Sequence, residues 1–132
     1  ALFNRCVYGV FDPVGYGADG KYGNEWDMTI WISDRGIESG RLKDILIHEA
    51  AHAYSFLVLR GCVVPDGSSF RELAHKRYGD EEHLADIFVL YYGGKWTNYD
   101  GRENIPIRDR SWMNNMIDYC NLYEEAKATL SS

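Results

Sequence analysis

The sequence predicts an α+β fold, in which a small N-terminal β-sheet packs on a buried helix and about three further helices follow. Apolar and polar residues alternate over residues 26–32, as they do in a strand with one covered face. Residues from about 40 to 60 are apolar at helical spacing, and helix start signals recur after residue 68. With 132 residues the chain can form one hydrophobic core, so we expect residues 1–132 to be a single domain.

Two strands are expected near the N-terminus. The first covers residues 6–11, which are rich in Val, Tyr and Phe, and the glycine-rich residues 15–20 mark a loop or hairpin end. The second covers residues 26–32, and one of its faces should pack on the core. That face carries Trp26, Met28, Ile30 and Ile32.

A long helix should begin at Ser39 or Gly40 and end at Arg60, with Gly61 as its C-terminal stop. Its apolar residues lie on both sides of the helical axis. We therefore expect most of its circumference to be buried and the helix to form the centre of the fold.

The loop predicted at residues 61–68 should be followed by a short helix. Ser69, with Glu72 three positions later, fits a capping box that opens a helix to Tyr78. Gly79 should close that helix, because glycine tolerates the left-handed backbone found at helix ends.

Two more helices are expected toward the C-terminus. Asp80 can cap a helix over residues 81–92, which two glycines should end. The polar residues 94–110 should form a surface loop with at most one short strand. The last helix should run over residues 111–127 and turn four residues toward the core, namely Trp112, Met116, Tyr119 and Tyr123.

Composition and charge exclude several classes of partner. The formal charge of −6 and the lack of a Lys/Arg cluster argue against nucleic acid as a substrate. No apolar run reaches the roughly 18 residues of a membrane span, so we expect no membrane insertion. We also expect the protein to be a monomer. Ten tyrosines, thirteen glycines and modest lysine content favour a secreted or extracellular protein, with a cytoplasmic location as the alternative. A mature form from which a signal peptide has been removed is compatible with this expectation.

The three cysteines, Cys6, Cys62 and Cys120, form no CxxC spacing. A cysteine-based zinc knuckle is therefore not expected. One disulfide plus a free thiol and three buried thiols both fit the sequence.

Residues 48–52 read His-Glu-Ala-Ala-His and are the most informative feature of the chain. On a helix, residues four positions apart have Cβ atoms roughly 5–6 Å apart, so His48 and His52 can bind one metal ion. This is the HExxH pattern of zinc peptidases. Burying these polar groups costs free energy that a metal would offset. A catalytic zinc takes three protein ligands and a water, so one more protein ligand is needed.

Glu82 is the best candidate for that ligand, because Asp86 follows four residues later on the same helical face. Glu82 can bind the metal, while Asp86 can accept the remaining N–H of a metal-bound histidine and so fix its tautomer.

With this pair of motifs, HExxH and then ExxAD, the segment from Leu42 to Tyr92 resembles the minimal gluzincins, which are thermolysin-like zinc metallopeptidases. The resemblance implies a zincin-like fold and one Zn²⁺ held by His48, His52 and Glu82. It implies Glu49 as the general base, Asp86 as the residue that orients a histidine, and a peptide or protein as the substrate. Zincin relatives bind that peptide as an added strand, for which residues 26–32 are the candidate.

The expected reaction is hydrolysis of a peptide bond by a zinc-activated water, with Glu49 accepting its proton. An additional donor should stabilise the oxyanion. The sequence does not choose among the candidates, which are His75, Tyr78, Tyr91, Tyr92 and Tyr99.

Other zincin patterns can be compared with the chain. A metzincin would need Gly and His where Ser55 and Val58 stand, and an inverted HxxEH site would need a histidine at Gly79. Both are excluded. An aspartate-ligand site using Asp80 or Asp86 remains open, as does a shift of register to Glu81.

Simpler interpretations stand beside the metal site. His48 and His52 could be hydrogen-bonded core histidines, and Glu81 and Glu82 could serve the positive N-terminus of their helix. His75 and His83 are expected to face solvent. At the level of function, the alternatives are an inactive homologue that binds a peptide as a metal-bearing module, and a dedicated repressor-cleaving protease.

Overall fold

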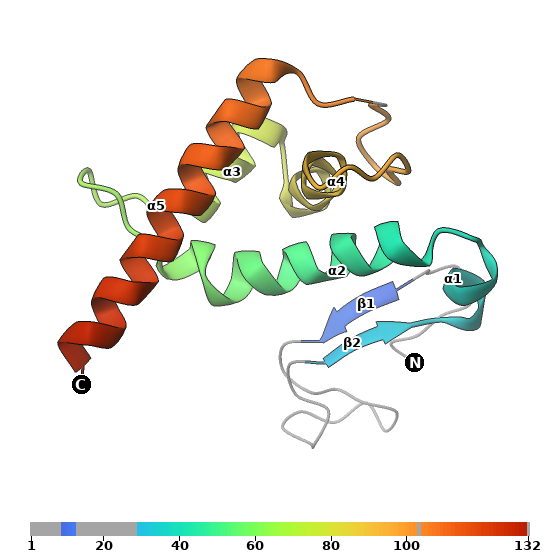
Figure 1. Cartoon of the computed structure of the whole chain (residues 1–132), viewed down its shortest axis with the longest axis horizontal. Coiled ribbons are helices and arrows are strands. Elements are labelled where there is room, and N and C mark those ends of the chain that lie inside the picture. The colour runs from blue at the N-terminus through green and yellow to red at the C-terminus, as the bar shows by residue number, and fades with distance from the viewer. Residues whose placement is uncertain (1–8, 13–28, 103, 132) are drawn as a thin grey trace.

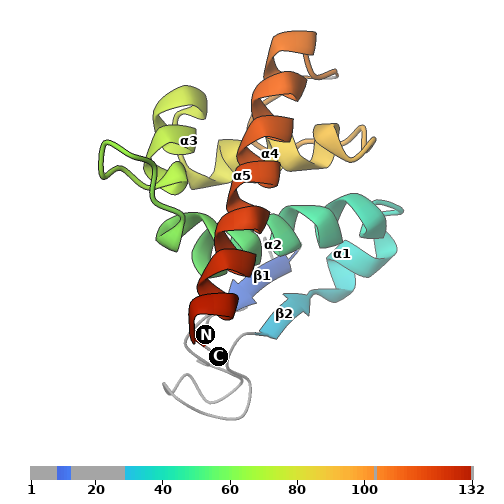
Figure 2. The ribbon, with the colours of Figure 1, turned by 60° about the vertical axis from the view of Figure 1, so that its left-hand side comes forward.

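The computed structural model of the chain describes residues 9–12, 29–102 and 104–131 (Figure 1). The described part is mostly helical, and its β-structure is one two-stranded antiparallel sheet. The predicted α+β class therefore holds only in part. Helix α2 (Leu42–Leu57) lies between this sheet and helix α4 (Glu81–Tyr91), and it contacts both (Figures 1 and 2).

The sheet pairs β1 (Gly9–Asp12) with β2 (Thr29–Ile32), and Gly9 stands opposite Ile32. A Cβ atom on Gly9 would lie 3.1 Å from the side chains of both Ile32 and Ile45, so glycine permits the close approach of β1 to α2. Each strand overlaps the range predicted for it. The rest of those ranges, including Trp26 and Met28, lies outside the described residues, as do Cys6 and the glycine-rich residues 15–20.

A short helix that the sequence analysis did not predict, α1 (Asp34–Glu38), joins β2 to α2. Its N-cap is Ser33, whose hydroxyl accepts a hydrogen bond from the backbone N–H of Gly36 at 3.1 Å. The serine cap was the sequence signal for a helix.

Helix α2 begins two residues after Gly40, which has a φ of 76° that α-helix does not allow. It ends at Leu57 and continues as a 3₁₀ turn, η1 (Leu59–Gly61). The expectation that most of its circumference is buried is wrong, because Leu46 is 42% exposed and Leu57 is 52% exposed. The buried residues lie along a stripe and are Ile45, His48, Glu49, Ala51 and Ser55.

Helices α3 (Phe70–Tyr78) and α4 follow the predicted boundaries closely. The hydroxyl of Ser69 accepts from the N–H of Glu72 at 3.1 Å, and Asp80 Oδ1 accepts from the N–H of His83 at 2.8 Å. Gly79 has a φ of 108°, so the chain can turn sharply between the two helices. These caps mark where α3 and α4 begin.

The last helix, α5 (Ile107–Ser131), is longer than predicted at both ends and passes α3 and α4 on one side of the molecule (Figure 2). Met113, Met116 and Cys120 are buried in the core, and the partly buried Trp112 and Tyr123 pack against it. Tyr119 differs from the prediction, because it is 38% exposed. The irregular stretch before α5 contains no strand within the described residues.

Two further features complete the fold. A disulfide joins Cys62, just after η1, to Cys120 on α5, which agrees with the one-disulfide alternative for the cysteines. Among the described residues, no helix is both long and apolar enough to cross a membrane.

Candidate metal centre

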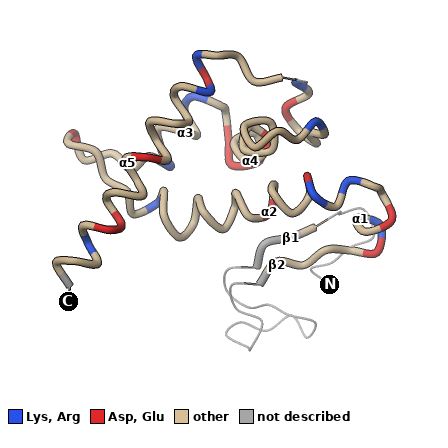
Figure 3. The backbone as a smooth tube through the Cα atoms, in the orientation of Figure 1, with Lys and Arg blue, Asp and Glu red and all other residues tan. Residues whose placement is uncertain are grey.

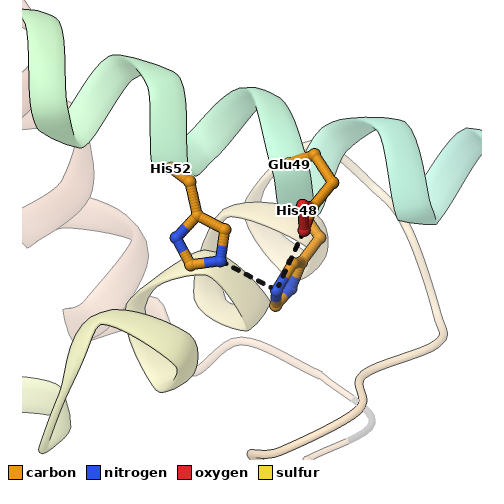
Figure 4. Close-up of side chains that lie close together, drawn as sticks. All are labelled: His48, Glu49 and His52. Carbon is orange, nitrogen blue, oxygen red and sulfur yellow. Dashed lines mark hydrogen bonds and ion pairs between the residues drawn. The ribbon is translucent and has the colours of Figure 1, made fainter. Parts of the chain in front are cut away.

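One face of α2 brings together His48, Glu49 and His52, and Figure 4 shows both imidazoles extending from the same side of this helix. The Nε2 atoms of the two rings lie 3.1 Å apart. One potential ligand atom from each of the three residues lies within 4.8 Å of the others. This group could hold a metal ion.

Helix α4 adds the carboxylate of Glu82 to the two imidazoles. Glu82 Oε1 lies 2.6 Å from His52 Nε2, and Glu82 Oε2 lies 3.5 Å from His48 Nε2. Glu82 lies in the first turn of α4, which Asp80 caps, and α4 packs against α2. Figure 3 shows this acidic start of α4 lying close to α2. The structure therefore places the carboxylate of Glu82 beside the Nε2 atoms of both imidazoles.

The opposite nitrogen of each imidazole faces a second carboxylate. His48 Nδ1 lies 2.9 Å from Asp86 Oδ1, and His52 Nδ1 lies 2.9 Å from Glu81 Oε2. A neutral ring that donates from Nδ1 leaves a lone pair on Nε2, which is the form that binds a metal. Asp86 thus lies at the nitrogen of His48 that faces away from Glu82. Glu81, interpreted as a charge for the helix N-terminus, has an additional partner in His52.

The carboxylates around the two imidazoles raise the pKa values of both rings. Burial alone would lower the pKa of His48, but its hydrogen bonds to Asp86 and Glu82 raise that pKa to about 9. Burial opposes the shift in His52 as well, and hydrogen bonds to Glu81 and Glu82 raise its pKa to about 10. The site therefore attracts positive charge strongly.

The same contacts favour the ionised form of the carboxylates. Burial by itself raises the pKa of Glu81, but hydrogen bonds from His52, His75 and Ser55 lower it to about 2. Burial and the histidine contacts act on Glu82 in the same opposed way, and the net pKa of Glu82 is well below its ordinary value. A cation at Nε2 of the two rings would meet charged acceptors.

Glu49 lies beside the imidazoles and is only 4% exposed. Its Oε1 is 3.9 Å from His48 Nε2, whereas Glu82 Oε1 lies 2.6 Å from His52 Nε2. Glu49 is therefore farther from the imidazoles than Glu82 is, but it is close enough to act on a molecule bound next to them.

Among the five candidate oxyanion donors, Tyr99 lies at the site. Its ring stacks beside His48, with 5.9 Å between centroids and 26° between planes. Burial and a hydrogen bond to the Glu82 carboxylate raise the pKa of Tyr99 to about 12, so the phenol keeps its proton at neutral pH. The backbone N–H groups of Tyr99 and Asp100 also donate to Asp86 Oδ2.

The other four candidates are engaged elsewhere. His75 Nε2 contacts Glu81 Oε1, Tyr78 donates to Asp109, and Tyr91 donates to Asn114. Tyr92 lines an apolar cavity of about 280 Å³, together with Ile47, Ala50, Ala51, Tyr54 and Phe88.

The aspartate alternatives fit this geometry less well than Glu82 does. Asp80 Oδ1 accepts from the backbone N–H of His83 and also contacts the ring of His83, at 2.8 Å in each case. Asp86 faces the Nδ1 side of His48, away from Nε2. His83 pairs with Asp80 on an exposed surface, as expected of a residue that faces solvent.

Two residues of the site were missed by the sequence analysis. Ser55 Oγ donates to Glu81 Oε1 at 2.7 Å, and Arg71 Nε lies 3.1 Å from Ser55 Oγ. Ser55 stands three residues after His52 and so shares its helical face, which was an available signal. Arg71 lies on α3, and no local spacing in the sequence connects it to His52.

Comparison of the chain with models of known families, with curated proteins and with solved structures found no match. The function is therefore inferred from the residues of this chain and their geometry.

Proposed function

We propose that the chain is a zinc-dependent metallopeptidase of the minimal gluzincin type, with a zincin-like arrangement of sheet, HExxH helix and glutamate-bearing helix. The observation that carries the proposal is the position of Glu82. Its two oxygens lie 2.6 Å and 3.5 Å from the Nε2 atoms of His52 and His48, while a carboxylate occupies the far side of each ring.

The donor atoms suit zinc in type and in spacing. Zinc binds imidazole nitrogen and carboxylate oxygen in a tetrahedron with bonds of about 2.0–2.1 Å, which puts the ligand atoms about 3.3 Å from one another. The Nε2 atoms are 3.1 Å apart, close to that spacing, and the carboxylate of Glu82 reaches both rings, with Oε1 2.6 Å from His52 Nε2 and Oε2 3.5 Å from His48 Nε2. A site made only of oxygens would suit magnesium or calcium instead.

His48, His52 and Glu82 would hold the ion. When bound, zinc supplies a Lewis acid that lowers the pKa of a water and polarises a carbonyl. Glu49 accepts the proton of the attacking water on its carboxylate and passes it to the leaving amine. The phenol of Tyr99, which keeps its proton at neutral pH, donates to the oxyanion that develops on the scissile carbonyl.

A peptide substrate can bind as an added strand. β2 pairs with β1 along one edge, and the sheet contacts the helix that carries His48 and Glu49. Backbone hydrogen bonds to a strand give affinity for extended peptides of many sequences. We therefore propose extended peptides or unfolded protein segments as the substrate class.

The first experiment measures metal and cleavage together. The purified protein should contain one zinc per chain and cleave a mixed peptide library. A chelator should abolish cleavage, and zinc, but not magnesium, should restore it. Zinc binding with no cleavage would instead favour a metal-bearing peptide-binding module.

The second experiment replaces the proposed base. Glu49→Gln should retain zinc and lose about 10²–10⁴-fold in kcat, because general-base catalysis typically contributes that much. Glu38→Gln, at an exposed position on α1, is the matched control and should leave turnover unchanged. Undiminished turnover in Glu49→Gln, with zinc retained, would refute the assignment of the base.

A further inference from the structure

We propose that Glu81 is a positioning residue for His52, and that Ser55, Arg71 and His75 hold its carboxylate in place. The inference rests on the proposed function, because it assumes that His52 binds zinc through Nε2. Each proposed histidine ligand would then have a carboxylate at its Nδ1 atom, Asp86 for His48 and Glu81 for His52.

The two oxygens of Glu81 have different partners. Oε2 faces His52 Nδ1 at 2.9 Å. Oε1 lies 2.7 Å from Ser55 Oγ, 2.7 Å from His75 Nε2 and 3.4 Å from Arg71 Nε. One oxygen therefore serves the metal-binding ring, and the other is held by donors from α2 and α3.

This arrangement determines the state of His52. A carboxylate at Nδ1 keeps the ring proton there, turns the ring, and makes Nε2 a better ligand. The side chain of His52 is only 12% exposed, so water has little access to replace Glu81 at Nδ1. Without Glu81, the proton can move to Nε2 and compete with the metal.

The simpler interpretation is that Glu81 only interacts with the positive N-terminus of α4. Glu72 allows a direct comparison, since it also lies in the first turn of a helix, α3. It is exposed at the surface. Replacing either glutamate removes a first-turn charge, but only the change at Glu81 removes a partner of His52.

The experiment measures zinc affinity by competition with a chromophoric chelator in the full chain. Glu81→Ala should weaken zinc binding by about 10–100-fold, the usual effect of removing such a partner. Glu81→Gln, which keeps an acceptor without the charge, should have an intermediate effect. Glu72→Ala should bind zinc as the unsubstituted protein does.

Two readouts separate positioning from a general loss of structure. In the zinc-bound protein, the NMR signal of the His52 Nδ1–H should be present with Glu81 and exchange-broadened in Glu81→Ala. His75→Ala should weaken zinc binding moderately, and the same change should have no further effect once Glu81 is alanine. Such non-additivity is expected only if His75 acts through Glu81.

The outcomes distinguish this inference from the proposed function. If the unsubstituted protein does not bind zinc, both are wrong. If it binds zinc and Glu81→Ala binds equally tightly, the role of Glu81 is refuted and the peptidase proposal stands. Should Glu81→Ala fail to fold, Glu81→Gln and His75→Ala decide: unchanged zinc affinity in both would overturn the inference.

Discussion

His48 Nδ1 lies 2.9 Å from Oδ1 of Asp86, a residue with no exposed surface. The other oxygen of Asp86 accepts hydrogen bonds from the backbone N–H groups of Tyr99 and Asp100. A single carboxylate therefore connects a proposed metal ligand on α2 to the loop that places Tyr99 beside the site. Ligand orientation and loop position should respond together when Asp86 is changed.

We expect Asp86→Asn to weaken zinc binding by about 10–100-fold, because the amide is a poorer acceptor for His48 Nδ1–H. The same substitution should speed hydrogen exchange at the amides of Tyr99 and Asp100, which lose a charged acceptor. Zinc competition and amide exchange measure the two effects separately.

Asp118→Asn, at an exposed position on α5, is the matched control for Asp86 and should change neither quantity. If Asp86→Asn neither weakened zinc binding nor sped exchange at the two amides, the contact of Asp86 with His48 and the loop would contribute nothing to zinc binding or to loop stability.

Tyr99→Phe tests the proposed oxyanion donor. Removing one such donor typically costs about 10²–10³ in kcat, whereas the ground-state affinity for substrate changes little. We therefore expect kcat to fall by about that factor, with KM and zinc affinity close to those of the unsubstituted protein. Steady-state kinetics on one cleaved peptide, together with zinc titration, provide the measurement.

Tyr92→Phe is the control for this change, because Tyr92 lines the apolar cavity between α2 and α4. Equal losses in the two variants would mean that the phenol of Tyr99 has no special role. A loss of zinc affinity in Tyr99→Phe would point instead to a role in holding Glu82.

The parts of the site that could be predicted depend on local geometry. His48 and His52 share a helical face because of their spacing, and the same is true of Glu82 and Asp86. The caps at Ser69 and Asp80 were equally readable and gave α3 and α4 nearly their observed bounds. Short-range rules of this kind depend on few residues, so sequence reasoning handles them well.

The parts that could not be predicted depend on how distant elements pack. Arg71 and His75 meet Glu81 only because α3 is folded back against α4, which no periodicity reveals. Tyr99 could not be distinguished from the other tyrosines, since its place is set by the bonds from its loop to Asp86. The exposure of Leu46 was misjudged because helical apolar spacing does not say how many neighbours cover a helix.

The disulfide between Cys62 and Cys120 should stabilise the fold without acting on the site. The two residues are 58 positions apart. A cross-link that closes a loop of that length reduces the entropy of the unfolded chain, which stabilises the folded protein by about 4 kcal/mol at 25 °C. We expect the double variant Cys62→Ala, Cys120→Ala to lose roughly that much unfolding free energy in urea, or somewhat less where the native structure relaxes. Its zinc affinity should not change, because the ligands lie on α2 and α4.

A reductant should destabilise the unsubstituted protein by a similar amount and leave the double variant unaffected, since the latter keeps only one cysteine. Equal urea midpoints for the oxidised and reduced protein would show that this cross-link does not limit unfolding.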